Sequence, residues 1–179
     1  MENPATLIQQ YYPTDTAPYS KPVYEASPLN RVLEQYAPGQ DWQSKGKSVK
    51  TAYQTNVASG DANLVCGKYR CASDMLFKEG NYDAGQLYVT QVSDEDGNIS
   101  YEFKDKLGQV ILTRQINNGE PFDTYYIYDD FGNLSAVLPP MLSDVYKNSA
   151  TVNINILNDP SIKNYAYLYV YDKRNRCIK

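Results

Sequence analysis

One short spacing recurs along this chain and constrains its fold more than any other feature. An Asp is followed three residues later by Gly or Asn, then by Asn, Gln or Arg, and then by an apolar residue. The pattern occurs at residues 94–99, 105–110, 129–134 and 172–177, and a looser copy occurs at 27–32. Each copy lies between segments rich in Tyr, Val, Ile and Leu, so each is predicted to be the turn of a β-hairpin.

The residue types in this pattern follow from turn geometry. The fourth position is one that most often requires positive φ, which Gly adopts freely and Asn tolerates. The Asp that begins each turn is expected to accept hydrogen bonds from backbone N–H groups of the turn. The predicted turn residues are Asp94, Gly97, Asp105, Gly108, Asp129, Gly132, Asp172 and Asn175. Because these carboxylates recur at one phase of a repeat, we interpret them as turn residues, and we predict no catalytic residue and no enzyme activity.

The segments between the turns predict the fold class. Residues 87–92, 99–103, 110–116, 122–128 and 134–138 are rich in β-branched and aromatic residues, and their connections are short. Neighbouring strands joined in this way pair antiparallel, so residues 85–140 are predicted to form the core meander of a mainly β domain that spans 23–179. Residues 1–22 carry four prolines and are predicted to be an extended arm.

Other segments outside the meander give weaker patterns. Residues 49–57 predict a strand, residues 64–77 predict a strand or an irregular strap, residues 141–146 a helical turn, and 151–157 a loose strand. Residues 165–171 alternate Tyr with apolar residues and predict a last strand. We interpret 165–179 as a truncated final repeat, because the chain ends soon after the last turn begins.

The composition excludes several classes of function. The net charge is −4 and no basic stripe is present, which argues against a nucleic-acid partner. No run of about 20 apolar residues exists, so no membrane insertion is predicted. Histidine is absent, and with it the Ser-His-Asp and Cys-His arrangements of hydrolases. The N-terminus resembles no signal peptide, so either export is not encoded here or the chain is a piece of a longer exported protein.

No cofactor or metal site is predicted. The acidic residues 94–98 lack the ligand positions of a calcium-binding EF-hand loop, and three cysteines without histidine make a tetrahedral zinc site improbable. Cys66 and Cys71 are compatible with a disulfide that leaves Cys177 unpaired, or with free buried thiols. The redox state of the three cysteines stays open.

The 18 tyrosines allow two interpretations. Aromatic rings pack across neighbouring strands, and they also form the platforms on which β-sheet modules bind sugars. We favour packing, and we keep Trp42, Tyr165, Tyr167 and Tyr169 as candidate glycan-binding residues.

Two of the repeat copies carry a family resemblance. Residues 128–134, Tyr-Asp-Asp-Phe-Gly-Asn-Leu, and residues 171–177, Tyr-Asp-Lys-Arg-Asn-Arg-Cys, resemble the YD repeat of the bacterial Rhs family, Tyr-Asp-x-x-Gly-Arg-Leu. Residues 27–39 and 94–108 are similar to the region that precedes the repeat array in that family. The resemblance implies a β-strip that winds into a hollow, secreted or cell-surface shell around a C-terminal effector, often a toxin.

The resemblance also has limits that shape the predicted function. The chain carries no complete array, no self-cleaving aspartyl-protease core and no variable C-terminal cargo, so it is not a closed capsule by itself. We therefore predict a non-catalytic structural section of an Rhs-type shell or of a cell-surface repeat protein. Its expected partners are further YD repeats or a second copy, paired along the strand edge at 165–179. The alternative is a module that binds carbohydrate or another cell-envelope ligand.

Overall fold

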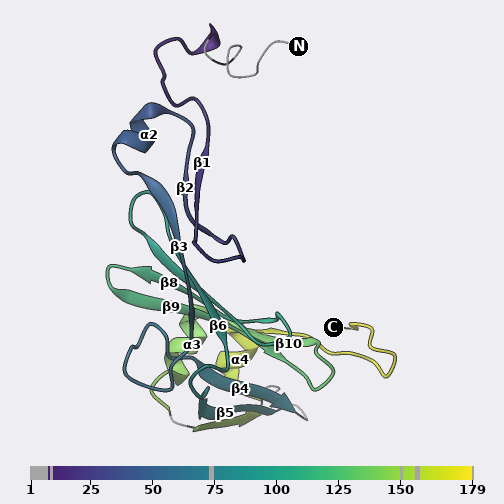
Figure 1. Cartoon of the computed structure of the whole chain (residues 1–179). Coiled ribbons are helices and arrows are strands. Elements are labelled where there is room, and N and C mark those ends of the chain that lie inside the picture. The colour runs from purple at the N-terminus through teal and green to yellow at the C-terminus, as the bar shows by residue number, and fades with distance from the viewer. Residues whose placement is uncertain (1–7, 9, 73–74, 150, 156–157, 179) are drawn as a thin grey trace. The chain divides into compact units, whose positions relative to one another are not determined.

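The structure is a computed structural model that describes residue 8 and residues 10–72, 75–149, 151–155 and 158–178. The chain divides into two compact units. The first comprises Met1–Ala52 with Gln91–Ile99, and the second comprises Tyr53–Thr90 with Ser100–Lys179. Strands dominate both units, and Figure 1 labels most of the elements described below. The prediction of a mainly β, antiparallel fold is confirmed.

The first unit is built on a small antiparallel sheet in which β2 lies between β1 and β3. Its elements are β1 (Lys21–Tyr24), β2 (Val32–Tyr36), α2 (Gln40–Ser44) and β3 (Ser48–Thr55). Between β1 and β2, Asn30 has φ 50° and its N–H donates to the Ser27 carbonyl oxygen at 3.2 Å. The looser copy of the repeat therefore forms a hairpin turn. The unit also contains the turn between β6 (Tyr88–Ser93) and β7 (Ile99–Lys104).

Only part of the predicted arm, residues 1–22, is described, because residues 1–7 and 9 lie outside the described residues. Within the described part, Ala17 is buried and its N–H donates to Asp15 Oδ1 at 2.9 Å. The N–H of Gln40 donates to the same oxygen, also at 2.9 Å. The Asp15 carboxylate thus joins the end of the arm to the start of α2.

The second unit contains two antiparallel sheets (Figure 1). In this unit the strands of the larger sheet follow the order β6-β7-β8-β9-β10-β12, and those of the smaller sheet follow the order β11-β5-β4. The strands not yet given are β4 (Gly67–Ala72), β5 (Met75–Asn81), β8 (Val110–Asn117), β9 (Glu120–Tyr128), β10 (Leu134–Leu138), β11 (Thr151–Asn155) and β12 (Tyr167–Leu168). β8, β9 and β10 begin and end within two residues of the predicted strands, which confirms the meander.

The core of the second unit lies against β9. Tyr125 of this strand is the cross-strand partner of Leu112 on β8 and of Leu138 on β10, and all three are buried. Two other elements also contact β9, namely β4 and the helix α3 (Pro140–Tyr146). The largest fully buried side chains of the unit include Leu76, Phe103, Leu112, Leu138, Leu142 and Ile162. Each stabilises the fold by about 1.5–3 kcal/mol relative to an exposed position.

The predicted strand at residues 165–171 is confirmed only over two residues, because β12 contains Tyr167 and Leu168 alone. Tyr165 is instead the last residue of the helix α4 (Pro160–Tyr165). Asp159 caps α4, because its Oδ1 accepts a hydrogen bond from the Ile162 N–H at 3.0 Å. Pro160 occupies the first position of the helix, where proline is favoured because its missing N–H would have no partner within the helix. The Asn-Asp-Pro sequence before residue 161 is therefore a helix start as well as a strand break.

The segment that the sequence left undecided, residues 64–77, forms most of a hairpin. β4 pairs antiparallel with β5, and β5 pairs on its other side with β11. Residues 73–74 and 156–157 lie outside the described residues. The predicted loose strand at 151–157 thus belongs, in its described part, to the smaller sheet rather than to the meander. The short helix α2, which contains Trp42, was not predicted.

Candidate functional site

The four repeat turns share one set of backbone hydrogen bonds. In each turn the Asp N–H donates to the carbonyl oxygen four residues later, at 2.9–3.0 Å, and the N–H of the Gly or Asn donates back to the Asp carbonyl oxygen, at 2.9–3.1 Å. The Asp Oδ1 accepts from two further N–H groups, two and four residues later, at 2.8–3.0 Å. One carboxylate oxygen therefore holds each turn closed.

The fourth position of each turn has positive φ. The values are 86° at Gly97, 84° at Gly108, 81° at Gly132 and 61° at Asn175. Residues other than Gly and Asn adopt such angles only with strain, which explains why the pattern permits these two types. The Asn98 side chain, with backbone N–H groups, lowers the pKa of Asp94, and the backbone N–H of Arg176, with its guanidinium, lowers the pKa of Asp172.

The second carboxylate oxygen separates the turn at Asp105 from the other three. Oδ2 of Asp94, Asp129 and Asp172 accepts from the side chain four residues later, at 2.7, 3.0 and 2.8 Å respectively. Gln109 occupies that position after Asp105, but its Nε2 donates to the Gly132 carbonyl oxygen at 3.0 Å. Among the described residues, no hydrogen bond or ion pair engages Asp105 Oδ2.

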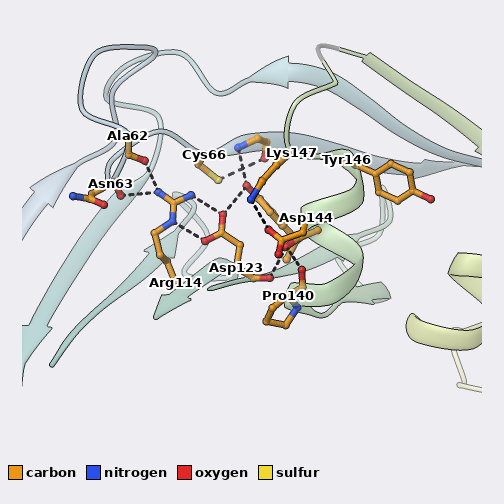
Figure 2. Close-up of polar contacts among 12 residues, drawn as sticks. Ala62, Asn63, Cys66, Arg114, Asp123, Pro140, Asp144, Tyr146 and Lys147 are labelled. Atoms are coloured by element: carbon orange, nitrogen blue, oxygen red, sulfur yellow. Dashed lines mark hydrogen bonds and ion pairs between the residues drawn. The ribbon is translucent and has the colours of Figure 1, made fainter. Parts of the chain in front are cut away.

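A buried ion pair joins β8 to β9. Arg114 Nε and Nη2 donate to the two carboxylate oxygens of Asp123, each at 2.6 Å, and the two side chains are only 6% and 15% exposed. Arg114 Nη1 donates to the carbonyl oxygens of Ala62 and Asn63 at 2.7 and 2.9 Å. Figure 2 shows the guanidinium held between these carbonyl groups and the carboxylate. Burial by itself would lower the pKa of Arg114. The hydrogen bonds to Asp123 and the negative charge of its carboxylate outweigh this effect, so the pKa of Arg114 is raised.

Other buried polar groups also link segments distant in sequence. Lys78 Nζ of β5 donates to the carbonyl oxygens of Tyr146 and Lys147, at the end of α3, at 2.9 and 3.0 Å. Asn56 Oδ1 accepts from the Leu87 N–H at 2.8 Å. No buried side-chain nitrogen or oxygen of the described residues lacks a hydrogen-bond partner. Each buried polar side chain of this network thus has its hydrogen-bond partner within the fold.

A small pocket is lined in part by residues at the start of β8 and the end of β9. Its volume is about 140 Å³ and its lining includes five tyrosines, Tyr69, Tyr82, Tyr125, Tyr126 and Tyr128. Asp105 and Gln109 of the turn between β7 and β8 complete its polar lining. Burial, followed by smaller contributions from nearby charges that include Asp105, raises the pKa of Tyr82 to about 12. The Tyr82 hydroxyl is therefore neutral near neutral pH.

The candidate glycan-binding aromatics are only partly brought together. Trp42 lies in α2 of the first unit and is 43% exposed. In the second unit, Tyr165 ends α4 at 45% exposure and Tyr167 lies in β12 at 63% exposure, while Tyr169 is half-buried. The predicted row of tyrosines on one face of one strand is wrong, because Tyr165 belongs to a helix.

Cys66 and Cys71 are free thiols in this structure, and the three cysteines differ in burial. Cys66 is fully buried, and burial raises the pKa of its thiol, while Cys71 is half-buried and Cys177 is exposed. Among the described residues, no group of three or more His, Cys, Asp and Glu side chains is arranged to hold a metal ion. In that same part of the chain, no helix has the length and hydropathy needed to cross a bilayer.

Sequence reasoning missed Arg114, Asp123, Asn56 and Lys78. Arg114 and Asp123 did leave a signal, since each is a charged residue inside a run that otherwise predicts a strand. Two opposite charges at facing positions of neighbouring strands are expected to pair. Asn56 and Lys78 left none, because their partners come from loops and helix ends that a local pattern does not identify.

One family model matches part of the chain. It is described as a domain of unknown function (DUF6443), and it matches residues 1–55, which is under a third of the 179 residues. No curated protein matches. The match covers β1, β2, α2 and β3, whereas the four strict repeat turns lie outside it.

Proposed function

We propose that this chain is a non-catalytic structural section of an Rhs-type YD-repeat shell or of a secreted or cell-surface repeat protein. The observation that carries the proposal is the shared hydrogen-bond pattern of the four turns, which is what a repeating structural unit requires. A catalytic Asp would have surroundings and hydrogen-bond partners different from those of the Asp at the equivalent position in the other turns. Three of these four aspartates accept their hydrogen bonds from the same positions of the turn, although the side chain that donates to Oδ2 is Asn in two turns and Arg in the third.

Neighbouring turns of the second unit also bond to one another, which supports a strip built by repetition. Gln109 Nε2 donates to the backbone carbonyl oxygen of Gly132. Asn133 Nδ2 donates to the side-chain oxygen Oδ1 of Asn175. The turns at 105–109, 129–133 and 172–176 are therefore linked in series. A further repeat is able to extend this series by the same kind of amide contact.

The last hairpin has the exposed surface that such an extension would cover. β12 pairs with β10 through only two residue pairs, and beyond it Tyr171 and Cys177 form an isolated antiparallel bridge. Tyr167, Val170 and Ile178 are 63%, 42% and 65% exposed. Exposed apolar side chains on a strand edge favour pairing with another strand. The proposed partners are further YD repeats or another copy of this chain.

The structure of the full-length gene product that contains this segment tests the shell proposal. We expect electron cryomicroscopy to show more hairpins of the same turn type, continuing the sheet beyond Asn175 in a wall around a cavity. A full-length product in which residues 23–179 form an isolated domain, with no further repeats paired to it, would refute the proposal.

Light scattering tests the edge pairing separately. The chain is expected to dimerise as its concentration rises, and Val170→Lys should keep it monomeric. Leu107→Lys is the matched control, because Leu107 is 83% exposed in a turn and away from the last strand. A strict monomer over the whole concentration range would count against pairing through residues 165–179.

A second candidate, glycan binding, rests on the exposed rings of Trp42, Tyr165 and Tyr167. NMR titration with cell-wall oligosaccharides tests it, with Trp42→Ala and Tyr167→Ala as separate variants for the two units. Shifts confined to these rings, lost in the corresponding variant, would support glycan binding. Unchanged ring signals at millimolar oligosaccharide would leave packing against a neighbouring strand as the role of these residues.

A further inference from the structure

The pocket of the second unit contains a carboxylate that lacks a counter-charge. Asp105 Oδ1 is used by the turn, where it accepts from the N–H groups of Leu107 and Gln109 at 2.8 and 2.9 Å. Its Oδ2 has no hydrogen bond or ion pair among the described residues. A partly buried carboxylate is stabilised most by a cation that donates hydrogen bonds to it.

A second turn of this chain shows which partner fits. In the turn at Asp172, Arg176 Nε donates to Oδ2 at 2.8 Å, so a guanidinium occupies the place that is open at Asp105. Gln109 stands at the position of Arg176, but it contacts Gly132 instead. Lys78 of the smaller sheet, whose Nζ lies 5.7 Å from the centroid of the Tyr69 ring in the pocket lining, donates to two backbone carbonyl groups. It therefore does not neutralise Asp105.

The remaining lining suits a small, flat cation. Tyrosine rings attract cations over their faces, and neutral tyrosine hydroxyls accept hydrogen bonds from N–H donors. The volume of about 140 Å³ is close to the roughly 150 Å³ of a protein cavity that binds benzene, a flat molecule of about the size of methylguanidine. A neutral sugar would leave the charge of Asp105 uncompensated.

We propose that the tyrosine pocket at Asp105 binds a guanidinium group, as the free end of an arginine side chain or of a small guanidine. Asp105 Oδ2 accepts its N–H donors, and the rings around Tyr82 and Tyr128 enclose it. The proposal is independent of the shell role, because it concerns a site inside one unit and not the pairing of its edges.

NMR titration of the whole chain with methylguanidine tests the proposal. Backbone signals of residues 105–109 and ring signals of Tyr82 and Tyr128 are expected to shift together, with a dissociation constant on the order of 1–10 mM for so small a ligand. Methylurea has the same shape without the charge and is expected to bind at least about tenfold more weakly. Binding should weaken as salt is added.

Three variants separate the proposed contact from the stability of the turn. Asp105→Asn should weaken methylguanidine binding at least about tenfold, whereas Asp129→Asn, which changes the equivalent turn residue outside the pocket lining, should leave binding unchanged. Gln109→Arg is the third variant, and it remains informative if Asp105→Asn fails to fold. Its guanidinium should occupy Asp105 Oδ2 as Arg176 occupies Asp172, and so abolish binding of methylguanidine in a folded protein.

The results that overturn the proposal are equally specific. Equal binding of methylurea and methylguanidine would show that charge is not recognised. Binding retained in Gln109→Arg would show that Asp105 Oδ2 is not the contact. A neutral methyl glycoside that binds where methylguanidine does not would assign the pocket to sugars instead.

Discussion

Replacing Arg114 with Met removes the cation of the buried ion pair and leaves the Asp123 carboxylate without a partner in the protein interior. The two side chains are 6% and 15% exposed, so water compensates for little of the lost charge. Removing one member of such a pair costs about 3–5 kcal/mol. Because Asp123 keeps slight exposure, we expect the lower part of this range, about 3 kcal/mol.

The double variant Arg114→Met with Asp123→Leu removes both charges. Apolar replacement of a whole buried pair is often neutral, so we expect a cost under about 1 kcal/mol. The carbonyl groups of Ala62 and Asn63 lose their donor, but both residues are exposed and water is able to replace it. The double variant is therefore expected to be more stable than either single variant.

Urea unfolding followed by circular dichroism measures these costs, and amide exchange in β8 and β9 assigns them to the second unit. With an m value of about 2 kcal/mol/M, the midpoint of Arg114→Met should fall by roughly 1.5 M. Asp41→Asn is the control, because it removes a carboxylate from an exposed pair with Lys45 and should not move the midpoint. A loss under about 1 kcal/mol in Arg114→Met, or a double variant that costs the sum of both singles, would refute the reasoning.

Three further predictions concern the turns and the cysteines. Gly108→Ala should lower stability by about 1 kcal/mol more than Gly108→Asn in thermal unfolding. Because φ is 84° and no atom lies within 4 Å of an added Cβ, the difference comes from backbone strain alone. Equal losses in the two variants would contradict this. The hydrogen bond from Arg31 lowers the pKa of Glu25 to about 2, so its contribution to the β1–β2 hairpin is present above about pH 4.5 and lost as the pH falls towards 2. NMR of the hairpin should show this loss, and Arg31→Met should move it to higher pH. Finally, an aromatic disulfide reagent should label Cys177 rapidly and Cys66 only after unfolding, since Cys66 is buried and burial raises its pKa; rapid labelling of both thiols would contradict the buried position.

The hairpins of the meander were predictable because their determinants are local. Each repeat turn is specified by five consecutive residues, and the hydrogen bonds that its Asp makes reach no further than four residues along the chain. The strands on either side follow from β-branched and aromatic runs. For the same reason β8, β9 and β10 match their predicted bounds, and the local pattern is enough to place Gly132 in a turn.

The errors fell where a local pattern had two solutions. The segment before residue 165 combines Asn, Asp and Pro, which both break a strand and begin a helix. The tyrosines after it alternate as in a strand, but the capped helix includes the first of them. The strand at β11 was predicted, but its partner was not, because it pairs with β5, some 75 residues earlier in the chain.

The sequence by itself determined the turns, the antiparallel hairpins and the absence of histidine-based chemistry, because these depend on residue types within a few positions. Tertiary structure decided which charged side chains form ion pairs and which do not. Arg114 meets both Asp123 and a loop more than 50 residues earlier, and Gln109 turns towards Gly132 and away from Asp105. Four turns with one sequence pattern thus differ in one carboxylate oxygen, because its partner depends on which segment the fold brings beside it.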